Sequence, residues 1–484
     1  MQSALFAIPS SLVVRCYENG ADLPDYRTEF MRDRDRVMYC TAFRRLSGKT
    51  QIYTIGSDDH KKNRLTHSLE VSQIARTISH ALGLNCDLAE AMALAHDFGH
   101  TPFGHAGERM LHEIMIPEST CIKESPFYNC KQKNILDTIN REQSKMCNGV
   151  TADNMFGFKH NIQSVRVACV LEDSYRSKDN KNIGLNLTNY TLWGMMNHSS
   201  LRYDSDSLFP NYQNGFAKQI QVNGSSSEAW SFEAYIVRLA DDIAQWHHDL
   251  EDAIRGEAIP IATLCETIVE ALGNRMSEED DSCINEIKKT KRVDRKIIAN
   301  ISHIVVNTLV NDVVETSKKN LSELEKHLKE KYKNQDDRDV AAIVYSDYDS
   351  VGFNGKQDTI ISLSDSIKVS QFKETIKEMV HHSRDVERMN EKGKYIIRKL
   401  FEAYYSHPQQ LPDGPIFHFM VDIGQWDNID AARDEGAGKV RTDFEKVLTN
   451  PTVIVKSVLM RRICDHIASM TDHYAIEEYN SLYG

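Results

Sequence analysis

Apolar residues recur every three to four positions over long stretches of this chain, and that period restricts it to a mainly helical fold. Residues 228–255 and 452–479 follow this pattern. The segment 88–98 (LAEAMALAHDF) is apolar on almost all sides, which is typical of a helix buried in a core. In residues 64–84 the recurring positions are Leu65, Leu69, Ile74, Ile78 and Leu82.

Strand signals are confined to one region. The segments 341–345 (AAIVY) and 359–364 (TIISLS) flank a turn-rich stretch and are the candidates for a small β-hairpin. The charged run 317–339 indicates an exposed helix and a mobile connector. A chain of 484 residues favours at least two domains, and we expect a catalytic half, 1–256, followed by a helical half, 257–484.

Charge and cysteine content narrow the class of protein. The chain has 70 acidic and 58 basic residues and a net charge of −12, which argues against a surface built mainly to coat nucleic acid. Its 10 cysteines form no CxxC pair, so we expect reduced thiols in the cytoplasm instead of a disulfide framework. Pro9 interrupts the N-terminal apolar segment, which we interpret as neither a signal peptide nor a membrane anchor.

Titratable residues gather with glycines and a proline in residues 94–108, LAHDFGHTPFGHAGE. His96 and Asp97 side by side suit a divalent cation such as Mn²⁺, Fe²⁺ or Mg²⁺. His67 and Asp241 are candidates to complete such a site, because each is polar within an apolar helical segment, where an unpaired polar group is costly. Taken singly, each also has an ordinary explanation as a core histidine or an exposed helix face.

The order of these residues along the chain resembles the HD-domain superfamily of metal-dependent phosphohydrolases. A longer ordered set of segments resembles the deoxynucleoside triphosphate triphosphohydrolases, the dGTPase family, and spans nearly the whole chain. The segments are RTEFMRDRDRVMYCTAFRRLSGKTQ (27–51), NRLTHSLEV (63–71), HDFGHTPFGHAGE (96–108), FKHNIQSVRV (158–167), GLNLT (184–188), ADDIAQWHHDLEDA (240–253) and DHIASMTDHYA (465–475).

The resemblance implies an all-α HD core in residues 1–256 and hydrolysis of dNTPs, with dGTP a candidate preference, to deoxynucleoside and inorganic triphosphate. Residues 257–484 are expected to complete the substrate pocket and to form a homo-oligomer, for which family members supply a hexamer as precedent. Single-stranded DNA is not indicated as a partner, and neither is a membrane. One divalent cation per subunit is implied, Mn²⁺ or Mg²⁺ with Fe²⁺, Co²⁺ and Ni²⁺ as further candidates, held by His67, His96, Asp97 and Asp241.

Hydrolysis at the α-phosphorus also requires a proton for the departing 5′-oxygen. His105 and Glu108 are three residues apart in a new helix, so their side chains can meet. A carboxylate on one imidazole nitrogen sets the tautomer and raises the basicity of the ring. His100, four residues after His96, can face the same cavity. We therefore predict catalytic roles for His105, Glu108 and His100.

Cationic side chains are predicted to hold the phosphates. Arg64 lies one helical turn before His67, and the resemblance places it on a phosphate. Arg45 and Lys49, with Arg44, form a second basic cluster. For any single arginine here, a solvated face or an ion pair is the alternative.

Amide and carboxylate side chains are predicted to contact the sugar. The resemblance places Gln51 and Asp249 near the deoxyribose 3′-hydroxyl. Gln245 stands where the family commonly has a substrate-contacting tyrosine, and Asn197-His198 stands where many members have Lys-Tyr. These departures concern selectivity and one phosphate contact.

Two other functions stay open. One is another HD-type nucleotide phosphohydrolase, such as a nucleotidase, which would not require the long second half. The other is a regulator that binds nucleotide or single-stranded DNA and keeps a structural cation, against which the His105–Glu108 pair argues.

Overall fold

The fold is helical wherever the chain is described, and the prediction of a mainly α-helical protein is confirmed. In the residues that the structure describes there are three isolated β-bridges and no β-strand. The computed structural model describes residues 4–17, 26–50, 62–115, 157–177, 182–199, 229–255, 259–290, 294–368 and 384–484.

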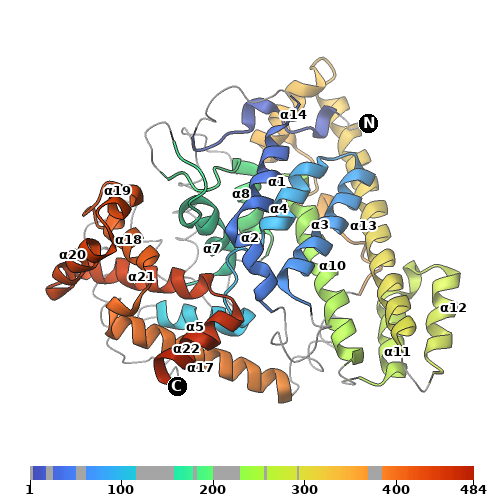
Figure 1. The fold of residues 1–484 in the computed structure, drawn as a ribbon. Coiled ribbons are helices and arrows are strands. Elements are labelled where there is room, and N and C mark those ends of the chain that lie inside the picture. Colours follow the sequence, from blue (N-terminus) through green and yellow to red (C-terminus); the bar gives the residue numbers. More distant parts are fainter. Residues whose placement is uncertain are drawn as a thin grey trace.

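Figure 1 colours the helices by their position in the chain, from blue at the N-terminus to red at the C-terminus. Those up to residue 255 are α1 (Glu29–Tyr39), α2 (Thr41–Arg45), α3 (Arg64–Leu82), α4 (Cys86–Ala95), α5 (Gly104–Met115), α7 (His160–Arg166), α8 (Asn189–Asn197) and α10 (Phe232–Arg255). The later ones are α11 (Ile261–Leu272), α12 (Glu278–Ile287), α13 (Arg295–Lys331), α14 (Asp337–Ser346), α15 (Gln357–Ile360), α17 (Arg384–Ser406), α18 (Asp413–Asp422), α19 (Ile429–Asp434), α20 (Ala437–Thr449), α21 (Val453–Ser469) and α22 (Asp472–Tyr483). A π-helical turn spans Val167–Leu171, and 3₁₀ turns span Ala4–Phe6, Ser10–Leu12, Leu46–Gly48, Gly273–Arg275, Tyr348–Val351 and Pro408–Gln410.

Three hydrophobic cores hold these helices together. The first packs α3, α4 and α10 against α13, the second packs α5 against α17, α18 and α20–α22, and the third joins α1, α2, α4, α7 and α8. In Figure 1, α5 accordingly lies among the late helices at the lower left, apart from α3 and α10. The chain crosses from the first core to the second over residues 96–103, which is the segment that carries the predicted chemistry.

The predicted halves, 1–256 and 257–484, share cores. Val237 of α10 lies in the same core as Val305 of α13, and Leu111 of α5 lies in the same core as Ile463 of α21. The division near residue 256 stays a prediction about function, since the packing of the described residues does not follow it.

The predicted hairpin is wrong. Residues 341–345 lie within α14, whose first turn is capped by Asp336, the side chain of which accepts from Arg338 N at 2.8 Å. The buried residues of α14 are Val340, Ala341, Val344 and Tyr345, a helical spacing. Short apolar runs of this kind do not separate strand from buried helix by periodicity alone.

In the charged run 317–339 the predicted helix is confirmed as far as Lys331, but its predicted exposure is wrong on one side. Helix α13 continues to Lys331 and buries Leu321, Leu324 and Leu328 on one side. By length and composition α13 is the one described helix that could cross a membrane, with half of its most apolar stretch buried. It packs along α10 and α3 in the first core, as central helices of globular proteins do.

Candidate active site

The crossing between α4 and α5 is built from residues that interrupt helices. Phe103 and Gly104 adopt left-handed φ angles of 61° and 57°, which turn the chain into α5. At Gly99 a side chain is excluded, because a Cβ atom there would lie 2.1 Å from the carbonyl oxygen of His160. Ser164 fastens this contact: its hydroxyl donates to His96 O at 2.6 Å and accepts from Gly99 N at 2.9 Å. The start of α7 is therefore docked against the turn.

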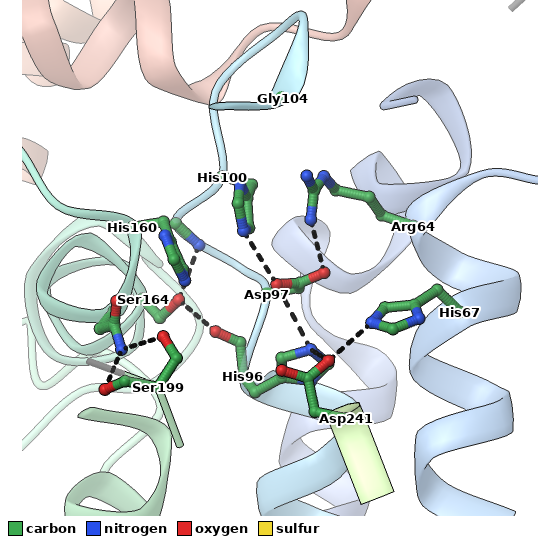
Figure 2. A network of polar contacts seen from close by, with 12 residues as sticks. Arg64, His67, His96, Asp97, His100, Gly104, His160, Ser164, Ser199 and Asp241 are labelled. Atoms are coloured by element: carbon green, nitrogen blue, oxygen red, sulfur yellow. Dashed lines mark hydrogen bonds and ion pairs between the residues drawn. The ribbon is translucent and has the colours of Figure 1, made fainter. Parts of the chain in front are cut away.

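The four residues predicted to hold a cation converge here, although they come from two helices, α3 and α10, and from the turn itself (Figure 2). His67 of α3 has its Nε2 2.9 Å from Oδ1 of Asp241 in α10. His96 follows α4, and its Nε2 lies 3.3 Å from Oδ1 of Asp97 and 3.6 Å from Oδ1 of Asp241. Ligand atoms of His67, His96 and Asp97 all lie within 4.8 Å of one another.

The orientation of His96 fits a cation. Its Nδ1 lies 2.7 Å from Ala93 O, and because a carbonyl only accepts, Nδ1 carries the proton. Nε2 then carries a lone pair. This nitrogen is buried, makes no hydrogen bond within the described residues and faces two carboxylates. The lone pair of Nε2 and the carboxylate oxygens repel one another. A divalent ion between them would attract all of these groups, so the residues present fit such an ion.

Arg64 is held by Asp97. Its Nη1 lies 2.7 Å from Asp97 Oδ2, and the side chain is 2 % exposed. Although burial raises the pKa of Asp97, the guanidinium of Arg64 lowers it, and the result is a pKa well below the usual value. Asp97 is therefore an anion whose second oxygen is directed towards His96 and His100, the latter at 3.2 Å.

The second cluster lies on the far side of the turn and centres on Glu108. This carboxylate is 1 % exposed and accepts from Nδ1 of His105 at 3.0 Å and from Nδ1 of His160 at 3.1 Å. Burial raises the pKa of Glu108, but the two histidines lower it well below its usual value. His105 is the outermost member, with 56 % of its side chain exposed.

His100 connects the two clusters. Its ring stacks on His160, with centroids 3.9 Å apart, and its Nε2 reaches Asp97. Burial, Arg64 and His160 hold the pKa of His100 well below its usual value. His100 is therefore neutral near pH 7 in this structure. The structure brings His100, His105 and Glu108 together, and their catalytic roles stay predictions.

Sequence reasoning assigned no role to two histidines that belong here. His160 stood within a quoted motif, and His198 was noted only as a departure from the family. Both are buried, and their ring centroids are 5.4 Å apart. Burial lowers the pKa of His198 to about 3. The available signal was the one that identified His67, namely a histidine within an apolar helical segment.

Lys49 and Arg45, the two residues of the second basic cluster predicted to bind a phosphate, differ from each other in burial. Lys49 is buried, and its ammonium donates to the carbonyl oxygens of His100 and Ala468, the second at 2.8 Å. Lys49 thereby joins the turn to α21. Arg45 is exposed at the end of α2. Their roles toward a phosphate stay predictions.

Of the predicted sugar contacts, Gln51 lies outside the described residues. Gln245 and Asp249 follow Asp241 at intervals of four on α10, so the three share one face of that helix. Gln245 is half-buried and Asp249 is buried. Their contact with a sugar stays a prediction.

Two family models match parts of this chain. Residues 64–141 match the HD domain, and residues 364–418 and 452–481 match a phosphohydrolase-associated domain. The first range holds three of the four candidate cation ligands, and the HD domain implies a divalent metal and phosphohydrolase chemistry.

Full-length relatives extend the match to most of the chain. A protein of Rickettsia felis is 32 % identical over 464 residues, which cover 95 % of this chain and 93 % of the relative. A protein of Bartonella henselae is 31 % identical over 466 residues, which cover 94 % and 90 %. Both are named deoxyguanosinetriphosphate triphosphohydrolase-like protein. The chain belongs to this deoxyguanosinetriphosphate triphosphohydrolase-like family of HD-domain phosphohydrolases.

Proposed function

We propose that the protein hydrolyses deoxynucleoside triphosphates at the α-phosphorus and releases deoxynucleoside and inorganic triphosphate. The observation that carries the proposal is the juxtaposition of two clusters on one turn, a candidate cation site and a buried histidine–glutamate network, joined by His100. The names of the relatives favour a purine deoxynucleotide, with dGTP the first candidate.

His67, His96, Asp97 and Asp241 would hold the divalent ion, for which Mn²⁺ and Mg²⁺ are the first candidates. When bound, such an ion supplies Lewis acidity toward the phosphate and lowers the pKa of a coordinated water. The chain's part is to fix the ligands: Ala93 orients the ring of His96, and Arg64 orients the carboxylate of Asp97.

Arg64 is also suited to bind a phosphate oxygen. One of its nitrogens is engaged by Asp97, while its buried Nε has no hydrogen-bond partner among the residues described. A buried guanidinium N–H without a partner is costly, and a phosphate oxygen beside the cation would satisfy it.

His105 would supply the proton to the departing 5′-oxygen. Because Glu108 accepts from Nδ1 of His105, Nε2 is the nitrogen left to exchange a proton with substrate. Glu108 is ionised and buried, and its contact with Nδ1 fixes the orientation of the His105 ring. His105 is the exposed member of its cluster and so the one that a leaving group can reach from solvent.

Gln51, Gln245 and Asp249 would select the sugar, and residues 257–484 would complete the pocket and build a homo-oligomer in the cytoplasm. Gln245 is the specificity position to test, because it replaces an aromatic hydroxyl. We expect ribonucleotides to be poorer substrates than deoxynucleotides.

The products of one reaction test the proposal. The purified protein is incubated with Mn²⁺ and each dNTP, and products are identified by chromatography and ³¹P NMR. Deoxynucleoside with intact triphosphate is the expected outcome. Orthophosphate alone would indicate another HD-type phosphohydrolase, and binding without turnover would indicate a nucleotide-binding regulator. Asp97→Ala serves as the inactive control.

A further inference from the structure

His198 lies at the C-terminal end of α8, close to the candidate cation site. We propose that His198 is a fifth protein ligand of the ion held by His96, Asp97 and Asp241. This inference rests on the proposed cation site and deepens it, because it concerns a residue at which this chain departs from the family.

Proximity is the first observation. One ligand atom each of His96, His198 and Asp241 lie within 4.8 Å of one another, and the same holds for Asp97, His160 and His198. His198 is thus close to three of the four residues assigned to the ion. Its ring centroid is 4.9 Å from that of His96, and the side chain is buried.

The orientation of the ring is the second observation. Nδ1 of His198 lies 2.7 Å from Met195 O, so Nδ1 carries the proton and Nε2 offers only a lone pair. His96 uses the same arrangement at the end of α4, where Nδ1 meets Ala93 O at 2.7 Å. A backbone carbonyl that fixes the tautomer of an imidazole is the usual support of a histidine metal ligand.

The tautomer of His198 favours a metal ligand over a side chain that binds phosphate. Phosphate oxygens accept hydrogen bonds, and a nitrogen lone pair cannot donate to them. A cation does accept a lone pair, and His96, Asp97 and Asp241 would hold such a cation next to His198. The geometry therefore favours ligation by His198 over substitution for a phosphate-binding side chain.

The consequence is a site with three imidazoles, His67, His96 and His198, and two carboxylates. Imidazole favours borderline ions such as Fe²⁺, Co²⁺ and Ni²⁺ over Mg²⁺, which prefers oxygen ligands. The added histidine should therefore strengthen binding of Co²⁺ more than binding of Mg²⁺.

Metal affinity tests the assignment without using activity. The full chain, stripped of metal, is titrated with Co²⁺, Mn²⁺ and Mg²⁺ by calorimetry, and the visible absorption of bound Co²⁺ is recorded. His198→Phe retains a ring and removes the nitrogen. We expect Co²⁺ to bind roughly 10–100-fold more weakly, with a changed Co²⁺ spectrum and a smaller loss for Mg²⁺. His198→Asn provides a second variant if the first does not fold by circular dichroism.

His466→Phe is the matched control, since His466 lies in α21 beside Tyr404, with ring centroids 5.4 Å apart, and should leave affinity and spectrum unchanged. If wild type and both His198 variants bind Co²⁺ with equal affinity and equal spectra, the inference fails while the proposed cation site stands. Two ions in wild type and one in His198→Phe would also overturn it, because His198 would then hold a separate ion. If the wild type binds no ion, the cation site fails first and the inference fails with it.

Discussion

The cation site and the Glu108 cluster lie at opposite ends of one short turn, but the protein encloses them differently. His67, His96 and Asp97 are each buried and lie on or directly after helices of the first core, whereas His105 is half exposed at the start of a helix packed in the second core. A cation ligand must be held in one geometry, which rigid packing provides. A proton donor must also reach substrate and solvent, and an edge position provides that.

Each cluster should therefore fail in its own way. Loss of a cation ligand should remove both the ion and activity, whereas loss of the proton donor should remove rate alone. The first three of the four predictions that follow test this contrast, and the fourth tests the scaffold that both clusters share, in order from the largest expected effect to the smallest.

Asp97→Ala should abolish both metal binding and hydrolysis. It would also leave Arg64 buried without its anion, which is expected to cost about 3–5 kcal/mol of unfolding free energy. Metal content by mass spectrometry and denaturant unfolding check both effects. Asp465→Ala is the matched control, because it removes a buried carboxylate paired with a half-buried arginine, Arg166 at 2.7 Å, and should destabilise the fold while the ion stays bound. Retention of stoichiometric Mn²⁺ by Asp97→Ala would remove Asp97 from the ligand set.

His105→Ala should lower kcat by about 10²–10⁴-fold, the usual contribution of a general acid. Metal content and dNTP affinity should stay near those of the wild type. The double variant with Glu108→Gln should be little slower than His105→Ala, because the two residues act as a unit. His473→Ala provides the control, since His473 and Glu477 form an exposed pair at the same 3.0 Å. If His105→Ala remains fast and His100→Ala or His160→Ala is inactive, the donor is a buried histidine.

Arg64→Gln should weaken dNTP binding roughly 10–100-fold, as expected for loss of a charged hydrogen bond of about 1.5–3 kcal/mol. Binding of the deoxynucleoside, which has no phosphate, should change much less. Calorimetry with both ligands measures the difference. Arg34→Gln removes an arginine paired with Asp87 on the other end of α4 and should affect neither ligand. Equal losses for both ligands would make Arg64 a purely structural partner of Asp97.

Glu233 tests the scaffold without touching either cluster. It is buried at the start of α10 and accepts from Asn85 N, at the start of α4, at 2.8 Å. It therefore joins α10, which carries Asp241, to α4, which leads into His96. Burial raises its pKa from 4.5 to about 7. The folded protein thus keeps a proton that the unfolded chain releases, and stability should fall by about 3 kcal/mol as pH rises from about 4.5 to 7, at 1.36 kcal/mol per pKa unit.

Glu233→Gln should remove that component and flatten the pH dependence of unfolding relative to the wild type. Urea unfolding of both proteins at pH 5 and pH 8 provides the measurement. Parallel profiles for the two proteins would show that Glu233 does not exchange its proton in this range.

The helices that carry the site were predictable because their signals are local. The apolar period of residues 64–84 identified α3 together with His67, and the all-round apolar segment before His96 identified α4. Local signals failed in α14, because four or five apolar residues in a row suit either a strand or a buried helix. The outcome there depended on the first core, against which Val344 packs.

The sequence by itself determined which residue types the site contains and their order along the chain. Titratable groups within apolar helical segments are costly unless they are paired or bind a metal, and this made them recognisable. Only the tertiary structure decided which of them meet. Glu108 is shared by His105 and His160, which are 55 positions apart, and His198 joins His96 from a separate helix. Such contacts depend on how α5, α7 and α8 pack around the turn, and packing between distant segments leaves no periodic signal in either segment alone.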